Sequence, residues 1–128
     1  LFYSPKLFPA GRVHQVSSQV DVLPSIAGLA KVAYRNNTFG RNLFDTVSAT
    51  NRYAFIIDHD VRSIGLVSDE YYYTRNMKTG KQEFVSVTGN EAPVPGLATD
   101  SIKNYMGKLT DAWYETAKYL LQNNKKKN

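Results

Sequence analysis

Three consecutive residues, Asp58, His59 and Asp60, carry side-chain types that bind divalent metals in proteins. Side chains on a strand alternate between its two faces, so three neighbours on a strand cannot all reach one ion. In a turn they converge better, but the residues that orient the ligands must then come from elsewhere in the fold. Aspartate is also an ordinary turn residue. We therefore expect a polar turn between two strands here and assign no metal ligand to it.

The other candidates for chemistry form no local catalytic pattern. His14 is the only other histidine and is distant in the sequence, so no Ser-His-Asp arrangement is suggested. The chain has no cysteine, which excludes thiolate nucleophiles, disulfides and cysteine-based zinc sites from it. Its glycines never frame a lysine as a phosphate-binding loop requires. Serine and threonine hydroxyls stay open as nucleophiles, but we predict no catalytic, cofactor-binding or metal residue in this chain.

A run of three tyrosines, Tyr71–Tyr73, is a candidate surface for stacking on bases or sugars. On a strand, however, the middle ring faces away from its two neighbours, so the three rings do not make one platform. We expect packing in the core instead. The same reasoning assigns the helical stripe that contains Trp113 to the core.

The first element expected along the chain is a helix that begins near Asp21. This carboxylate is the expected N-cap, and it would accept from the N–H of Leu23, because Pro24 at the next position has no N–H to donate. Gly28 would let a neighbouring segment approach closely. We expect the helix to end near residues 31–33.

This helix carries an apolar stripe at helical spacing, formed by Val22, Ile26 and Leu29 and widened by Leu23 and Ala30.

Four later segments, rich in β-branched and aromatic residues, predict strands. They are Tyr53–Ile57, Val61–Ser68, Glu70–Arg75 and Lys81–Val87. The turn residues Asn76–Gly80 make the last two strands a hairpin. The final predicted element is an amphipathic helix, for which Thr99, Asp100 and Ser101 offer N-caps. Its apolar stripe comprises Ile102, Tyr105, Met106, Leu109, Trp113, Ala117, Leu120 and Leu121.

Composition places the chain among ordinary globular domains. Its 128 residues are 42% hydrophobic and 21% charged, and no apolar run is long enough to cross a bilayer. The formal net charge is +5, and three of these charges are Lys125–Lys127 in the tail. We expect a solvated terminus there rather than a binding site for an anionic surface. Because the sequence starts at Leu1 without a methionine or a leader pattern, we expect this residue to be a boundary inside a longer protein.

The order of the first elements resembles the late part of the sulfatase family, within the alkaline phosphatase superfamily. Residues 2–13, FYSPKLFPAGRV, and residues 17–30, SSQVDVLPSIAGLA, resemble that family's I-Y-x-P strand, Pro/Gly loop and V-D-V-x-P-T helix, with Ser25 where threonine is usual. The segment FGRNLF at residues 39–44 resembles a following G-R-D/S-L-L segment, with Asn42 where an acid or serine is common. Residues 54–74, AFIIDHDVRSIGLVSDEYYYT, are most similar to the lipoteichoic-acid-synthase-like branch.

The resemblance implies that this chain is the C-terminal portion of a metal-dependent hydrolase or phosphoglycerol/phosphoethanolamine transferase acting on sulfate or phosphate esters. In the family a hydroxyl-type nucleophile lies beside divalent metal, here Mn, Mg, Zn or Ca, which stabilises transition-state charge. Both are expected before Leu1, and the triplet Asp58–Asp60 is out of register with the family's ligands. The isolated chain is therefore expected to be non-catalytic and to contain no cofactor.

The partners implied are the preceding catalytic part of the same protein and, through it, an ester substrate. A homo-oligomer is a further expectation for the isolated piece, whereas nucleic acid is not an expected partner. The resemblance implies a bacterial, membrane-anchored parent with an extracytoplasmic domain, of which this segment is a soluble part.

The expected fold class is α/β, or α+β for the isolated piece. Residues 1–50 would end the sulfatase-like core, and residues 51–128 would form an antiparallel sheet with a C-terminal helix. Two alternatives stay open. In the first, the chain is a stand-alone binding module whose basic tail binds an anionic partner. In the second, it is an interaction domain that docks onto a catalytic part.

Overall fold

The structure is a computed structural model that describes residues 3–4, 6–7, 9–12, 14–45, 53–89, 93 and 95–123. Its elements are η1 (Gln19–Asp21), α1 (Val22–Ala30), β1 (Ala54–Asp58), β2 (Ser63–Val67), β3 (Tyr71–Asn76), β4 (Gln82–Ser86) and α2 (Leu97–Asn123). The expected α+β arrangement of an antiparallel sheet with a C-terminal helix is confirmed. The boundary expected at residue 50 and the Lys125–Lys127 tail lie outside the described residues.

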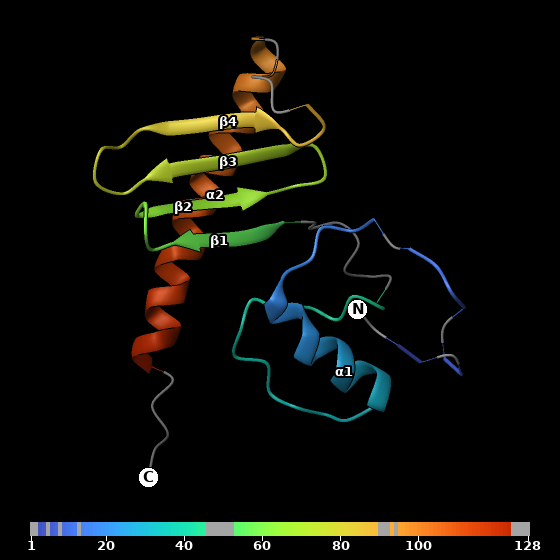
Figure 1. Ribbon diagram of the computed structural model, residues 1–128. Helices are drawn as coiled ribbons and strands as arrows, with labels where there is room; N and C mark the ends of the chain where they lie inside the picture. The colour runs from blue at the N-terminus through green and yellow to red at the C-terminus, as the bar shows by residue number, and fades with distance from the viewer. Residues whose placement is uncertain are drawn as a thin grey trace.

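The four strands form a meander in the order β1-β2-β3-β4, and each strand pairs antiparallel with its neighbour in sequence (Figure 1). Leu66 is opposite Phe55 on one side and Tyr73 on the other, and Tyr73 is opposite Phe84. Because side chains alternate along a strand, this row of four lies on one face. Helix α2 runs across the strands and covers that face (Figure 1).

The core lies between α2 and this face of the sheet. Leu66, Tyr73 and Met106 are fully or almost fully buried and contact one another. Gly107 allows the close approach, since a Cβ there would come within 3.1 Å of the Tyr73 hydroxyl oxygen. Burying each large apolar side chain contributes about 1.5–3 kcal/mol. Around these three pack the partly buried Tyr53, Phe55, Tyr71, Phe84, Ile102, Leu109 and Trp113.

Short polar turns set the register of the hairpins. The Asp58 carboxylate accepts from the backbone N–H groups of Asp60, at 2.9 Å, and Val61, at 3.1 Å. In the β3–β4 turn the Asn76 side-chain oxygen accepts in the same way from residues 78 and 79, and Gly80 adopts a φ of 71°. Asx turns of this kind define where each strand ends. Both turns lie where the sequence predicts them, but the first extends through Val61 and Arg62, so β2 begins at Ser63 and not at the predicted Val61.

Helix α2 begins earlier than its expected caps. Thr99, Asp100 and Ser101 all lie inside the helix, which starts at Leu97 and continues to Asn123. The carbonyl of Gly96 already accepts the first helical hydrogen bond, at 2.9 Å, from the Asp100 N–H. The cap prediction is therefore wrong, although Asp100 keeps a favourable place in the first turn, near the positive end of the helix dipole.

The apolar stripe of α2 is also shorter than predicted. Met106, Leu109 and Trp113 pack on the sheet as expected. Tyr105 and Leu121, in contrast, are exposed, the latter by 80%. The apolar residues therefore continue toward the C-terminal end of α2, beyond the part of the helix that packs on the sheet.

Helix α1 lies to one side of the sheet and packs against residues 36–43 of the same chain (Figure 1). It ends at Ala30, because Lys31 adopts a left-handed φ of 52° and the N–H of Val32 turns back to the Ala27 carbonyl at 3.0 Å. The end expected near residues 31–33 is confirmed. So is the role of Gly28, where a Cβ would overlap the Asn42 side chain.

Candidate functional site

The Asp21 carboxylate is buried and organises the segment around α1. One oxygen accepts from the Ser18 N–H at 2.7 Å, and the other accepts from the Arg41 N–H at 2.9 Å. The predicted bond to the Leu23 N–H is wrong, since no side-chain cap bond is made to α1. The physical reason is the short 3-10 turn η1 before the helix, which turns the carboxylate toward Ser18 and the distant Arg41.

Ser25 extends this network on the same side of α1. Its hydroxyl is fully buried, donates to the Asp21 carbonyl at 2.7 Å and accepts from the Leu43 N–H at 3.0 Å. The Arg41 guanidinium adds a bond to the Val16 carbonyl at 2.7 Å. The bonds from the Arg41 and Leu43 N–H groups reach Asp21 and Ser25 from 20 and 18 positions later in the chain, so the cluster holds α1 against residues 36–43. This polar cluster, Asp21–Ser25–Arg41, was not foreseen as a unit.

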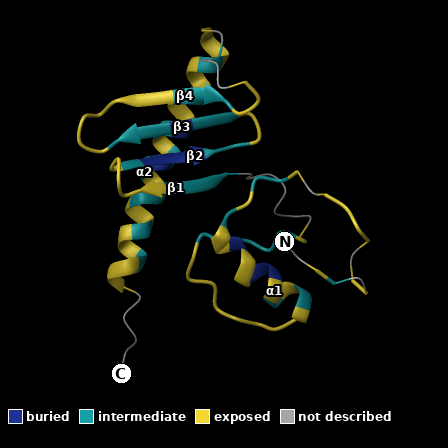
Figure 2. Cartoon of the chain, viewed as in Figure 1, coloured by how far each residue is buried: buried dark blue, intermediate teal, exposed yellow. Residues whose placement is uncertain are grey.

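As a consequence, α1 turns its polar side toward the rest of the chain and its apolar side toward solvent, which is the reverse of the usual orientation of an amphipathic helix. Its small and polar side, with Pro24, Ser25 and Gly28, faces residues 36–43. Its apolar side faces solvent, with Leu23 60% and Ile26 50% exposed (Figure 2). We call Val22, Leu23 and Ile26 of α1, together with Val20 of η1, the α1 apolar face. No residue of α1 carries a charge. An exposed patch of aliphatic side chains commonly marks a contact surface, so this face is a candidate contact surface.

Phe39 joins the α1 segment to the sheet. Its ring stacks on Trp113 of α2, with centroids 5.0 Å apart and planes 10° apart. It also meets Phe55 of β1 edge-on at 6.2 Å. Offset stacks and edge contacts of this kind add about 0.5–1.5 kcal/mol beyond the area they bury. The loop that the Asp21 cluster holds against α1 is thus also attached to the core.

Asp58 ends β1, and His59 and Asp60 belong to the exposed turn that its carboxylate closes between β1 and β2, so the predicted polar turn is present. His14 is exposed on the segment before η1. In the described part of the chain, no group of three or more His, Cys, Asp or Glu side chains is placed to hold a metal ion.

The tyrosine run divides between the two faces of the sheet, as predicted. Tyr71 and Tyr73 belong to the core under α2. Tyr72 faces the other way and lines a hollow of about 460 Å³ on the open face. We call this the sheet hollow. Its lining is Ile56, Asp58, Val61, Ser63, Ile64, Tyr72, Thr74, Asn76, Thr79, Lys81 and Glu83. No local sequence pattern indicated it, because its residues come from four strands and two turns.

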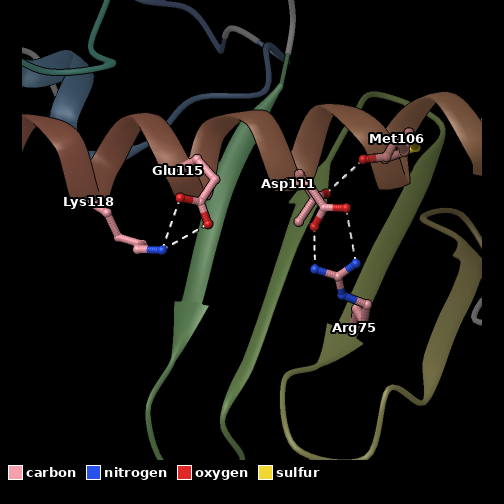
Figure 3. A network of polar contacts seen from close by, with 6 residues as sticks. Arg75, Met106, Asp111, Glu115 and Lys118 are labelled. Carbon is pink, nitrogen blue, oxygen red and sulfur yellow. Dashed lines mark hydrogen bonds and ion pairs between the residues drawn. The ribbon is translucent and has the colours of Figure 1, made fainter.

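A bidentate ion pair fastens α2 to the sheet. Arg75 of β3 donates from both terminal nitrogens to the Asp111 carboxylate of α2 (Figure 3). The pair lies beside the buried Tyr73, where burial raises the pKa of the phenol, Arg75 opposes the rise and Asp111 adds to it. Being partly exposed, the pair contributes at most about 1 kcal/mol. It orients α2 and offers no reactive group.

A second pair lies on the exposed side of α2. The Lys118 ammonium donates to both carboxylate oxygens of Glu115 at 2.9 Å (Figure 3) and lies 5.3 Å from the centre of the Tyr114 ring. The hydrogen bond to Glu115 raises the pKa of Lys118, which stays charged. This is a helix-surface pair of the ordinary i,i+3 type.

Among the described helices, none is both long enough and apolar enough to cross a membrane. Comparison with models of protein families, with curated proteins and with solved structures returned no match to this chain.

Proposed function

We propose that this chain is the C-terminal portion of a metal-dependent, sulfatase-like hydrolase or phosphoglycerol/phosphoethanolamine transferase, and that it serves to complete the enzyme's fold. In this proposal the nucleophile and the divalent metal belong to the preceding part of the protein. The parent is a bacterial membrane-anchored enzyme with an extracytoplasmic domain. The isolated chain turns over no ester.

The observation that supports this proposal is the α1 apolar face. The Asp21–Ser25–Arg41 cluster holds α1 through buried hydrogen bonds, with Leu23 and Ile26 outward. Covering these four half-exposed aliphatic residues would contribute roughly 1 kcal/mol each. The helix is the element on which the family resemblance is strongest, and in the proposed parent it packs on the catalytic part.

The experiment begins with the coding sequence upstream of Leu1, from which the catalytic part is produced separately. We expect it to bind this chain and to gain metal-dependent release of nitrophenol from an aryl phosphate or sulfate. Ile26→Asp should leave the isolated chain folded, because the side chain is half-exposed, and should abolish association. The matched control is Leu97→Asp, an exposed leucine at the start of α2.

Two outcomes would overturn the proposal. One is an upstream sequence without a hydroxyl nucleophile and a metal-binding Asp-His pair. The other is ester turnover by the isolated chain that a substitution within it abolishes. A third result would favour the stand-alone binding module instead. In that case the isolated chain binds an anionic polymer in a salt-sensitive way and loses that binding when residues 124–128 are removed.

A further inference from the structure

We propose that the sheet hollow binds a neutral saccharide unit, with Tyr72 as the stacking residue. The site is independent of any ester chemistry in the parent enzyme. It lies on the face of the sheet opposite to α2. Three features of the hollow carry the inference: its rigid shape, its acceptor-rich lining and the sign of its charge.

The shape of the hollow follows from the small residues on the two central strands. Gly65 of β2 lies between Ile56 of β1 and Thr74 of β3 in the register of the sheet. Gly65 adds no side chain to this face, and the Tyr73 carbonyl oxygen and the Thr74 methyl group already bound the place where its Cβ would lie. Ser63 and Thr74 are short as well. The volume of about 460 Å³ is within the range of small-ligand pockets and suits one or two sugar rings.

One end of the hollow is closed by two turns that are bonded to each other. The Asn76 side chain donates to the Val61 carbonyl at 2.7 Å, and the Met77 N–H donates to the Arg62 carbonyl at 2.8 Å. Asn76 also accepts from its own turn, so the turn residues have little freedom. A wall fixed in this way needs no reordering when a ligand binds, which lowers the entropic cost of binding.

The lining suits a ligand that is rich in hydroxyl donors. Asp58 and Glu83 supply carboxylate groups, of which one oxygen each is already bonded, by the β1–β2 turn and by Lys81. Ser63 and Thr74 supply hydroxyl groups that both donate and accept. Hydrogen bonds from ligand hydroxyls to carboxylates are charge-assisted and therefore stronger than neutral ones. The ring of Tyr72 and the side chain of Ile56 offer apolar surface for the C–H face of a sugar.

The charge of the hollow opposes anionic ligands. Its lining contains two carboxylates, Asp58 and Glu83, against one ammonium, Lys81. Lys81 is itself paired with Glu83 at 3.0 Å. A phosphate or sulfate group would therefore meet net negative charge and a cation that already has a partner. A neutral saccharide is not repelled by this charge and needs no free cation. A site for an anionic ester, in contrast, would need net positive charge.

The test is a titration of the isotopically labelled chain followed by amide NMR. The probes are glucose, maltose and N-acetylglucosamine, with inorganic phosphate and a lysine-rich peptide for comparison. We expect saturable shifts for Ser63, Tyr72 and Thr74 with at least one saccharide, in the millimolar range expected for a shallow site. Tyr72→Ala should weaken this binding about tenfold, since stacking on an aromatic ring contributes on that scale.

The matched control is Tyr119→Ala, which removes an exposed tyrosine of α2 and should leave binding unchanged. Retained Trp113 fluorescence shows that each variant is folded. No saturable shift with any saccharide would overturn the proposal. So would equal binding by Tyr72→Ala, or shifts of the same amides by phosphate or by the basic peptide alone.

Discussion

The backbone N–H of Arg41 donates a 2.9 Å hydrogen bond to the carboxylate of Asp21, twenty residues earlier in the chain. This bond holds the loop of residues 36–43 against the polar side of α1. The loop in turn places Phe39 on Trp113. A single buried carboxylate therefore links the orientation of α1 to the attachment of its whole segment on the sheet.

Replacing Asp21 by alanine should loosen this segment by about 2–3 kcal/mol, because the Ser18 and Arg41 N–H groups lose a charged acceptor. Amide hydrogen exchange at Arg41 measures the change locally. Asp60→Ala, which removes an exposed carboxylate in the β1–β2 turn, is the control and should have almost no effect. Equal protection of Arg41 in all three proteins would contradict the assigned role.

Gly40→Ala should destabilise the α1 segment strongly. A Cβ at this buried position would overlap the Val20 carbonyl and press on Pro24, and backbone cannot move away as a flexible side chain can. Gly89→Ala has open space around its Cβ and serves as the matched control. Urea unfolding followed by circular dichroism should show a large loss for the first variant and a change within about 0.5 kcal/mol for the second.

Phe39→Ala should expose Trp113 to water. Trp113 is the only tryptophan of the chain, so its fluorescence reports the surroundings of this one ring, which contacts both Phe39 and Phe55. We expect a red-shifted emission maximum and easier quenching by iodide, with the sheet still folded because Leu66, Tyr73 and Met106 are untouched. Leu7→Ala, at an exposed position outside this contact, should leave the spectrum unchanged. An unchanged spectrum for Phe39→Ala would show that the stack is not formed in solution.

Alkaline pH should destabilise the protein through buried phenols. Burial raises the pKa of Tyr73 above that of an unfolded tyrosine, which is about 10. The stabilisation is therefore complete below pH 10 and is lost as the pH rises from there through the folded pKa, because the unfolded chain releases its proton first. Tyr53, whose pKa burial also raises, contributes in the same direction.

The measurement is the free energy of unfolding between pH 8 and about 12 for the wild type and for Tyr73→Phe. The free energy of unfolding of the variant should fall less with rising pH than that of the wild type. The decrease that remains in the variant is due partly to Tyr53. Parallel curves for the two proteins would mean that Tyr73 has the same pKa in the folded and unfolded states.

Local chemistry made the sheet predictable. The turns at Asp58–Asp60 and Asn76–Gly80 use side chains that bond their own backbone within three residues, so the sequence alone indicates them. Alternation along β3 correctly separated Tyr72 from its neighbours. The start of α2 was misplaced by a few residues, because Thr99–Ser101 are good caps but the helical bond to Gly96 forms before them.

Long-range partners were not predictable from spacing. Asp21 looks like a local helix cap, and nothing near it indicates that its partner is the N–H of Arg41. Arg75 and Asp111 are 36 residues apart on different elements, with no shared periodicity. The apolar stripe of α1 faces solvent because residues 36–43 pack on the opposite side of that helix. Periodicity therefore predicted the stripe but not its exposure to solvent.

The meander places all four strands before the helix that covers them. During synthesis, β1 to β4 can pair one after another, each with the strand just made, while the face of Leu66 and Tyr73 has no cover. The 27 residues of α2 follow only afterwards. At typical rates of translation they take about one to five seconds to appear. For that interval the nascent sheet presents its future core to solvent or to a chaperone, and α2 is the segment whose arrival ends that exposure.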